Sequence, residues 1–344
     1  MTPEIVLLLA QDGLVNAAIY ALMAIAIVLV YAVTRIVFVP QGQFVSYGAL
    51  TLSTLLAGRV PGTIWILVVG VIWMALLDIR GLVRRRAARK AMLRPALWVV
   101  YAGVVAGLTV VAAPMKLPQG YAIALTMAIV VPLGPVSYRI VFEPIASASV
   151  LLLLIAAVAL DLVATGLCLL AFGAEGTGNP PISDFSFEVG EMLITAQSLF
   201  VLGAAIVTSF LLWLFFEKTL SGLALKATAI NRLGAKLVGI RTSNAGRLSV
   251  IIAAWIGTAS GILVSPLTTI YFNTGFLIGL KGFVAAIIAG LASYPLAIVG
   301  AIIVGLLEAF SSFWASAYKE IIVFTLIIPV LLWRSLGARD LDEE

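Results

Sequence analysis

The chain contains no histidine and only one cysteine, Cys168, among its 344 residues. A single cysteine cannot build a disulfide framework. Without histidine there is no imidazole for a metal site and no histidine proton relay. We therefore expect no bound metal and no cofactor.

Charge is scarce as well. Charged residues make up 11% of the chain, hydrophobic residues make up 62%, and the mean hydropathy is +1.17. This composition excludes a water-soluble globule for most of the length. Apolar windows of about 20 residues, each long enough to cross a bilayer as a helix, recur throughout. A β-barrel would show weak alternation instead, so the sequence predicts an all-α membrane protein.

Basic residues are missing from the start of the chain, where Glu4 and Asp12 are the only charged residues before the first long apolar run. A cleavable signal peptide needs a basic segment ahead of its apolar run. We therefore expect the first apolar run to be retained as a helix.

The apolar windows predict a polytopic transmembrane helical bundle of about ten or eleven helices, forming one transmembrane domain over residues 1–344. The expected spans are 12–33, 43–58, 63–79, 95–113, 120–138, 150–172, 194–215, 248–269, 279–292, 297–314 and 321–334. Residues 43–58 and 279–292 are short and rich in glycine, serine and alanine, and prolines interrupt several other spans. Short or broken helices at membrane depth usually line a cavity.

Lysine and arginine set the expected orientation. If residues 80–94 and 217–247 are cytoplasmic, strict alternation puts every basic residue inside except Arg59, Lys116, Lys281 and Lys319. The N-terminus then lies outside and the acidic loop 173–193 is external. The basic run at 84–86 is explained by topology, so we expect the lipid bilayer as a partner and no nucleic acid.

One polar segment, residues 218–247, lies between two long apolar runs. Its apolar and small residues recur at helical spacing, and its basic residues fall on other faces. The apolar set is Leu223, Ala227, Ile230, Gly234 and Leu237, and the basic set is Lys226, Arg232 and Lys236. The pattern predicts a short amphipathic helix at the membrane surface that a partner outside the bilayer could bind.

Two acidic residues fall inside apolar spans. An ionised Asp161 near the middle of its helix would cost about 2.5 to 3.5 kcal/mol, so it should face the bundle interior or stay protonated. It is either a pore or gate residue or a carboxyl hydrogen-bonded to a neighbouring helix. For Glu308 a structural role is favoured, as an interhelical hydrogen bond or a pair with Lys281 or Lys319.

Several motifs together resemble one family. They are Leu237-Val-Gly239-Ile240, the stretch from Leu280 to Gly290, Leu307-Glu308-Ala309-Phe310-Ser311-Ser312, Tyr318-Lys319-Glu320, Gln41-Gly42-Gln43 and, more weakly, Tyr138 to Pro144. From Ser221 onward the chain is similar to the membrane subunit of ATP-binding-cassette importers of the branched-chain amino acid type. It looks most like the smaller of the two permease subunits of such importers, as a divergent member.

The resemblance implies a transport subunit rather than an enzyme, in a bacterial inner membrane. Its implied partners are ATPase subunits, a second permease subunit and an extracytoplasmic substrate-binding protein. The chain lacks the Gly-x-x-x-x-Gly-Lys-Ser/Thr phosphate loop, so a partner must hydrolyse ATP. Residues 222–240 would be the coupling helix within the cytoplasmic loop 217–247. The coupling residues would be Gly222, Lys226, Ala227, Asn231, Arg232, Gly234, Lys236 and Gly239.

The expected translocation path uses polar and small residues at or beside the short segments. They are Gln41, Gly42, Gln43, Asp161, Asn273, Lys281, Gly290 and Ser293. The sequence departs from the family pattern where Gln41 and Gln43 replace a histidine and an acid, and where residues 59–119 look like an inserted helical hairpin. These departures allow a substrate other than leucine, isoleucine or valine, so the expected substrate is a branched-chain or other amino acid.

Two other classes compete with this interpretation. An ion-coupled secondary transporter would use the same broken helices with Asp161 as its coupling carboxylate, and its transport would not depend on ATP. A membrane enzyme would need convergent acids or a metal cluster near one interface, and the sequence shows neither.

Overall fold

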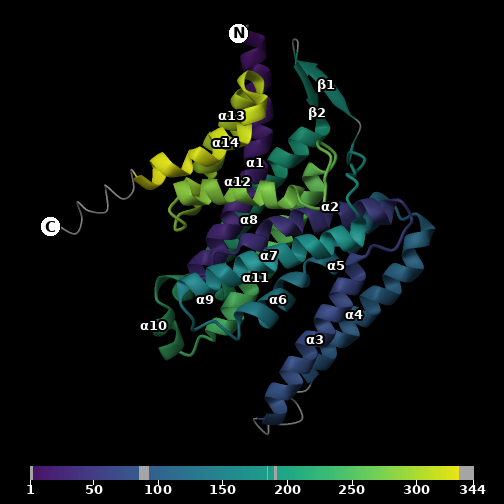
Figure 1. The fold of residues 1–344 in the computed structure, drawn as a ribbon, viewed down its shortest axis with the longest axis vertical. Coiled ribbons are helices and arrows are strands. Elements are labelled where there is room, and N and C mark those ends of the chain that lie inside the picture. The colour runs from purple at the N-terminus through teal and green to yellow at the C-terminus, as the bar shows by residue number, and fades with distance from the viewer. Residues whose placement is uncertain (1–2, 85–92, 184, 190–191, 333–344) are drawn as a thin grey trace, which may run out of the picture.

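The computed structural model describes residues 3–84, 93–183, 185–189 and 192–332. Within this part of the chain, eight helical segments are long and apolar enough to cross a membrane. The structure is an all-α bundle (Figure 1), which confirms the predicted fold class. A two-stranded antiparallel hairpin, β1 (Ser186–Val189) with β2 (Met192–Thr195), lies in the segment predicted to be an external loop.

The helices follow the predicted spans closely. The long ones are α1 (Pro3–Thr34), α3 (Thr63–Arg84), α4 (Leu93–Ala112), α7 (Val150–Phe172), α8 (Ala196–Lys218), α11 (Thr242–Val264) and α13 (Tyr294–Trp314). The shorter ones are α2 (Gln43–Leu56), α5 (Gln119–Val130), α6 (Leu133–Ser137), α9 (Leu220–Ile230), α10 (Arg232–Leu237), α12 (Thr274–Ile288) and α14 (Lys319–Thr325). Single turns of other helix types are η1 (Val39–Gly42), η3 (Ala113–Met115), η4 (Tyr138–Phe142) and η5 (Ser316–Tyr318).

Proline interrupts one of the expected spans, as the sequence predicts, and a turn interrupts another. The expected span 120–138 is broken, because α5 ends at Val130 and Pro132 begins a turn into α6. Proline lacks the N–H that would continue the ladder. The π-helix η4 then completes the crossing. In the last expected span a turn at Leu326 interrupts the helix, and residues 333 and 334 lie outside the described residues.

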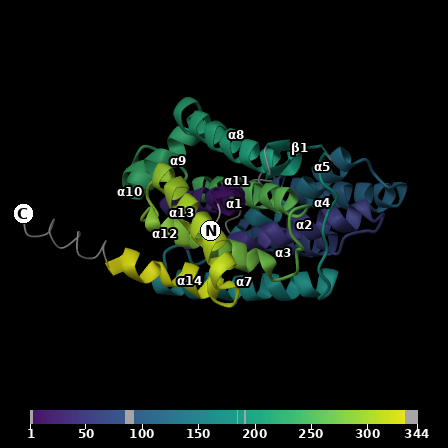
Figure 2. The same ribbon diagram turned by 90° about the horizontal axis from the view of Figure 1, so that it is seen from above.

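Helix α1 forms the centre of the bundle. Its middle is a continuous apolar run, and 89% of its most hydrophobic window is buried. Figure 2 shows α8, α11, α12 and α13 around it, and α1 contacts all four. A helix that is apolar on every face needs such surroundings.

Small residues let the central elements approach closely. A Cβ added at Gly261 of α11 would lie 2.1 Å from the carbonyl oxygen of Val45 in α2. A Cβ at Gly42 would lie 2.1 Å from the carbonyl oxygen of Gly275 in α12. Because of these contacts the backbone of α2 packs closely on α11, and the backbone of η1 packs closely on α12.

The antiparallel pair α3–α4 extends away from this centre (Figure 1). Only 28% and 22% of their apolar windows are buried within the chain. Most of their apolar surface therefore faces outward, as expected for helices that contact lipid.

Candidate functional site

Polar side chains gather where η1 meets α2. Gln41 Nε2 donates to the carbonyl oxygen of Ala253 in α11 at 2.8 Å. Gln43 Nε2 donates to Thr165 Oγ1 at 2.7 Å and to Asp161 Oδ1 at 3.2 Å, and both acceptors lie on α7. The amide oxygens of Gln41 and Gln43 are buried and have no hydrogen-bond partner among the described residues. The buried site therefore holds two acceptors that lack a donor.

Asp161 faces the interior, as the cost of a buried carboxylate predicts. Asp161 is only 4% exposed. The amide of Gln43 binds its side chain, and Thr165 Oγ1 donates to its backbone oxygen at 2.9 Å. The geometry of a carboxyl hydrogen-bonded to a neighbouring helix is present, and a role as a gate residue stays a prediction.

The first turn of α12 adds groups that the sequence did not single out. Ser46 Oγ of α2 accepts from the N–H of Gly275 at 2.8 Å and donates to the carbonyl oxygen of Tyr271 at 3.1 Å. Asn273, a predicted path residue, lies between them at the N-cap of α12. These contacts depend on close backbone approach, which residue types alone do not reveal.

Three predicted path residues lie elsewhere. Gly290 has φ of +65° just after α12, and Ser293 caps α13 by accepting from the N–H of Leu296. Lys281 Nζ binds Glu308 Oε1 at 2.5 Å. The structure brings Gln41, Gly42 and Gln43 together with Asp161. It places Lys281, Gly290 and Ser293 outside this group.

The pair of Lys281 and Glu308 belongs to a second buried cluster. Tyr20 of α1 donates a hydrogen bond to Glu308 Oε2, and the ammonium of Lys281 lies 5.8 Å from the centre of the Tyr20 ring. Lys281 is 7% exposed and Glu308 is 8% exposed. The structural role predicted for Glu308 is confirmed, with Lys281 rather than Lys319 as its partner, and the cluster joins α1, α12 and α13.

Beside Gln43 a cavity of about 540 Å³ opens on the outer side of α2, α3 and α7. Its lining is largely apolar and includes Trp65 and Trp73, which are mostly exposed. An apolar recess open to the lipid-facing side is a poor match for a polar substrate. The path expected at Gln41, Gln43 and Asp161 stays a prediction.

The segment predicted as one coupling helix forms two helices, α9 and α10. Asn231 between them is extended, with φ of −145° and ψ of 99°, and its Oδ1 accepts from the N–H of Gly234 at 2.9 Å. An asparagine in this role starts a new helix. The apolar periodicity continues through Asn231, which is why the break was missed.

Helix α9 is firmly seated on the bundle. Leu225 is buried with Leu29 and Val33 of α1 and with Ala245 of α11. A Cβ at Gly222 would lie 2.1 Å from the carbonyl oxygen of Phe215. Helix α9 therefore packs directly on the end of α1, the end of α8 and the start of α11.

The other face of α9–α10 is open. Ile230 is 83% exposed and Leu237 is 81% exposed, and Leu220, Leu233 and Val238 are exposed as well. Large apolar side chains gathered on a surface mark an interaction site. Of the other predicted coupling residues, Lys226 pairs with Glu217, Ala227 is half-buried, Lys236 is exposed and Gly239 has φ of +88°. Arg232 has a buried Nε without a hydrogen-bond partner among the described residues.

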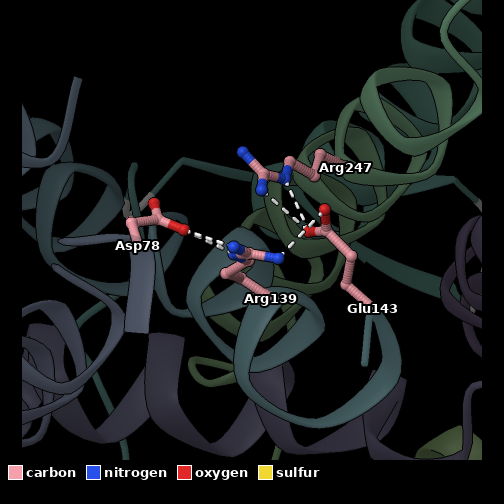
Figure 3. Close-up of polar contacts among 4 residues, drawn as sticks. All are labelled: Asp78, Arg139, Glu143 and Arg247. Carbon is pink, nitrogen blue, oxygen red and sulfur yellow. Dashed lines mark hydrogen bonds and ion pairs between the residues drawn. The ribbon is translucent and has the colours of Figure 1, made fainter. Parts of the chain in front are cut away.

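Figure 3 shows a chain of four charged residues that links α3 to α11. Arg139 of η4 donates through Nε to Asp78 Oδ1 of α3 at 2.7 Å, and its Nη1 lies 3.1 Å from Glu143 Oε1. Arg247 of α11 donates to Glu143 Oε2 through Nε at 2.9 Å and through Nη2 at 2.8 Å. Arg139 and Glu143 lie in the motif from Tyr138 to Pro144, but their other partners are not predictable from the sequence, because 61 residues separate Asp78 from Arg139 and 104 separate Glu143 from Arg247.

Comparison with known proteins identifies a family. The family described as the permease component of the branched-chain amino acid transport system matches residues 96–331. The high-affinity branched-chain amino acid transport system permease protein LivH of Escherichia coli K12 is 30% identical over 206 residues, which is 58% of this chain and 67% of that protein. The permease protein BraD of Pseudomonas aeruginosa is 27% identical over the same shares.

Two more distant similarities extend the comparison. A probable branched-chain amino acid transport permease protein LivH of Methanocaldococcus jannaschii is 27% identical over 222 residues, covering 57% of this chain and 66% of that protein. The solved structure of PsaBC from Streptococcus pneumoniae in complex with Fab aligns with a TM-score of 0.36 at 13% identity, over 93% of this chain and 90% of that chain.

The matched family segment, residues 96–331, spans more than half of the chain and includes the polar groups of α7, α11 and α12 and the whole of α9–α10. The relatives are permease components rather than enzymes. The chain is therefore a multi-pass membrane protein that belongs to the family of branched-chain amino acid transport system permease components.

Proposed function

We propose that the chain is the membrane subunit of an ATP-binding-cassette importer and that ATPase subunits dock on α9–α10. The observation that carries this proposal is the exposed apolar face of α9–α10, together with the packing of α9 on α1 and α11. A segment that contacts only lipid would not need the polar and basic residues that lie beside the apolar ones in α9–α10. A soluble partner that binds there could push on the bundle.

The contacts suggest how such a push would reach the path. Leu225 of α9 packs on α1 and on the first turn of α11. Further along α11, the carbonyl oxygen of Ala253 accepts from Gln41. A rigid-body displacement of α9 would therefore move the helix that positions η1 and the polar groups beside it.

The substrate we propose is a branched-chain or other amino acid. The free amide oxygens of Gln41 and Gln43 and the carboxyl of Asp161 favour a molecule that brings hydrogen-bond donors, such as an α-ammonium group. A second permease subunit would complete the path, an extracytoplasmic binding protein would deliver substrate, and the complex would reside in a bacterial inner membrane.

Docking can be tested without deleting the segment. Ile230→Asp and Leu237→Asp place a charge on the exposed face and leave the buried face of α9 intact. We expect both variants to fold, to lose co-purifying ATPase, and to lose ATP-dependent uptake of labelled amino acids in vesicles. Arg80→Ala, exposed at the end of α3, is the matched control and should retain both. Normal ATPase recovery with both aspartate variants would overturn the docking assignment.

The competing function, an ion-coupled carrier that uses Asp161, predicts a different result. Such a carrier would take up substrate from an ion gradient without internal ATP. Uptake that requires ATP and an external binding protein supports the importer instead.

A further inference from the structure

A cavity of about 670 Å³ lies between the α3–α4 pair and the start of α11. Met74 and Asp78 of α3, Leu97 and Trp98 of α4, and Asn244 and Arg247 of α11 line it, together with the proline turn that follows α5. This volume is typical of a pocket that holds a small molecule or part of a larger one.

One end of the cavity carries two charged groups whose hydrogen-bonding atoms are not all used within the chain. Asp78 and Arg247 are the two ends of the four-charge chain, and both line the cavity, whereas Arg139 and Glu143 between them do not. Arg247 contacts Glu143 through Nε and Nη2, and Asp78 contacts Arg139 through Oδ1. Figure 3 shows the other carboxylate oxygen of Asp78 and the other terminal nitrogen of Arg247 pointing to the same side of the chain.

These two atoms present opposite charges to one ligand. An anionic group of a ligand would form hydrogen bonds with Arg247 and with the side-chain amide of Asn244. The side chain of Asn244 makes no hydrogen bond to another described residue. A ligand cation would gain from Asp78. Because the four-charge chain is neutral as a whole, a zwitterion fits it better than an anion, which would be repelled by Asp78.

The remaining walls are apolar or amphipathic. Met74 and Leu97 face the cavity, and Trp98 and Tyr101 of α4 lie in its wall. Tryptophan and tyrosine are enriched at membrane interfaces. Asp78 is two residues before Arg80, where the predicted cytoplasmic loop begins. The cavity thus combines a charged end at interfacial depth with walls suited to hydrocarbon.

We propose that this cavity binds a membrane phospholipid with a zwitterionic head group, such as phosphatidylethanolamine. The phosphate binds Arg247 and Asn244, the ammonium binds Asp78, and an acyl chain lies along Met74 and Leu97. The lipid then fills the space between α3–α4 and α11. This site does not depend on the proposed transport function.

Lipid binding to the full-length chain tests the proposal. The protein is purified in detergent, stripped of lipid, and titrated with phosphatidylethanolamine or phosphatidylglycerol of identical acyl chains, and bound lipid is counted by native mass spectrometry. We expect phosphatidylethanolamine to bind more tightly. Leu97→Trp, which fills the apolar end, and Asn244→Leu should each weaken it by about tenfold.

Two further variants separate the site from general effects. Leu108→Trp adds the same bulk to an exposed position on α4 outside the cavity and should bind like the unmodified chain. Asp78→Asn should weaken phosphatidylethanolamine and leave phosphatidylglycerol unchanged or tighter. Equal binding of the two lipids, or tight binding that survives Leu97→Trp and Asp78→Asn alike, would overturn the proposal.

Discussion

Asp161 accepts a hydrogen bond from Gln43, and the amide oxygen of Gln43 lacks a donor. An asparagine at position 161 would remove a costly buried carboxylate and could donate to that oxygen. We expect Asp161→Asn to leave the thermal stability unchanged or to raise it by up to about 1 kcal/mol. Because the proposed contact with a substrate ammonium needs the charged carboxyl, ATP-dependent uptake in vesicles should weaken, with a raised KM. Uptake that an ion gradient drives without ATP in the unmodified chain, and that the variant loses, would instead support an ion-coupling role for this carboxyl.

The buried pair of Lys281 and Glu308 makes a second prediction. Lys281→Met alone leaves Glu308 without its counter-charge, which costs about 3 to 5 kcal/mol of stability when the pair is buried. Adding Glu308→Gln removes the charge and keeps an acceptor for Tyr20. Thermal unfolding in detergent should therefore show most of the loss recovered in the double variant. A double variant as unstable as Lys281→Met would contradict this account.

At the residue scale the sequence predicted what depends on residue type. Asp161 had to face the interior because a carboxylate in lipid is costly, and Glu308 had to find a partner for the same reason. The sequence could not predict that Ser46 meets the backbone of α12, or that Arg139 links Asp78 to Glu143. Those contacts depend on the relative placement of helices far apart in the chain.

At the element scale the break at Asn231 sets the angle between α9 and α10. Asn231→Ala removes the cap on Gly234, which costs about 1 kcal/mol and favours one continuous helix. We expect this variant to insert normally but to lose ATP-dependent uptake. Asn231→Asp keeps a capping oxygen and is the matched control. If the alanine variant transports like the aspartate variant, the break has no role in coupling.

The same break shows the limit of periodicity. Apolar spacing predicted most of the long helices to within a few residues, because a bilayer demands long apolar runs. Proline predicted that span 120–138 would be interrupted. Asparagine is a weaker signal, since it is tolerated within helices and caps them only where the local backbone allows.

At the scale of the whole molecule, the contacts sort the connecting segments into two ends. Thr177 pairs with Ile270 through backbone hydrogen bonds, and Asn179 donates to Ser265 Oγ at 2.8 Å. At the opposite end Arg35 donates to the carbonyl oxygen of Ala229 at 3.3 Å. The first group is the end predicted to be outside and the second is the end predicted to be cytoplasmic. The grouping is consistent with the predicted alternation of the spans.

Labelling of introduced cysteines decides the orientation. Cys168 is the only native thiol and is buried, so Cys168→Ser provides a background without thiols. In that background we expect Glu175→Cys and Lys116→Cys to react with an impermeant maleimide added outside intact cells. Ile230→Cys and Arg80→Cys should react only after the cells are opened, because positive charge is retained on the cytoplasmic side. The reverse pattern would invert the orientation and place α9–α10 beyond the reach of a cytoplasmic ATPase, which would remove the basis of the importer proposal.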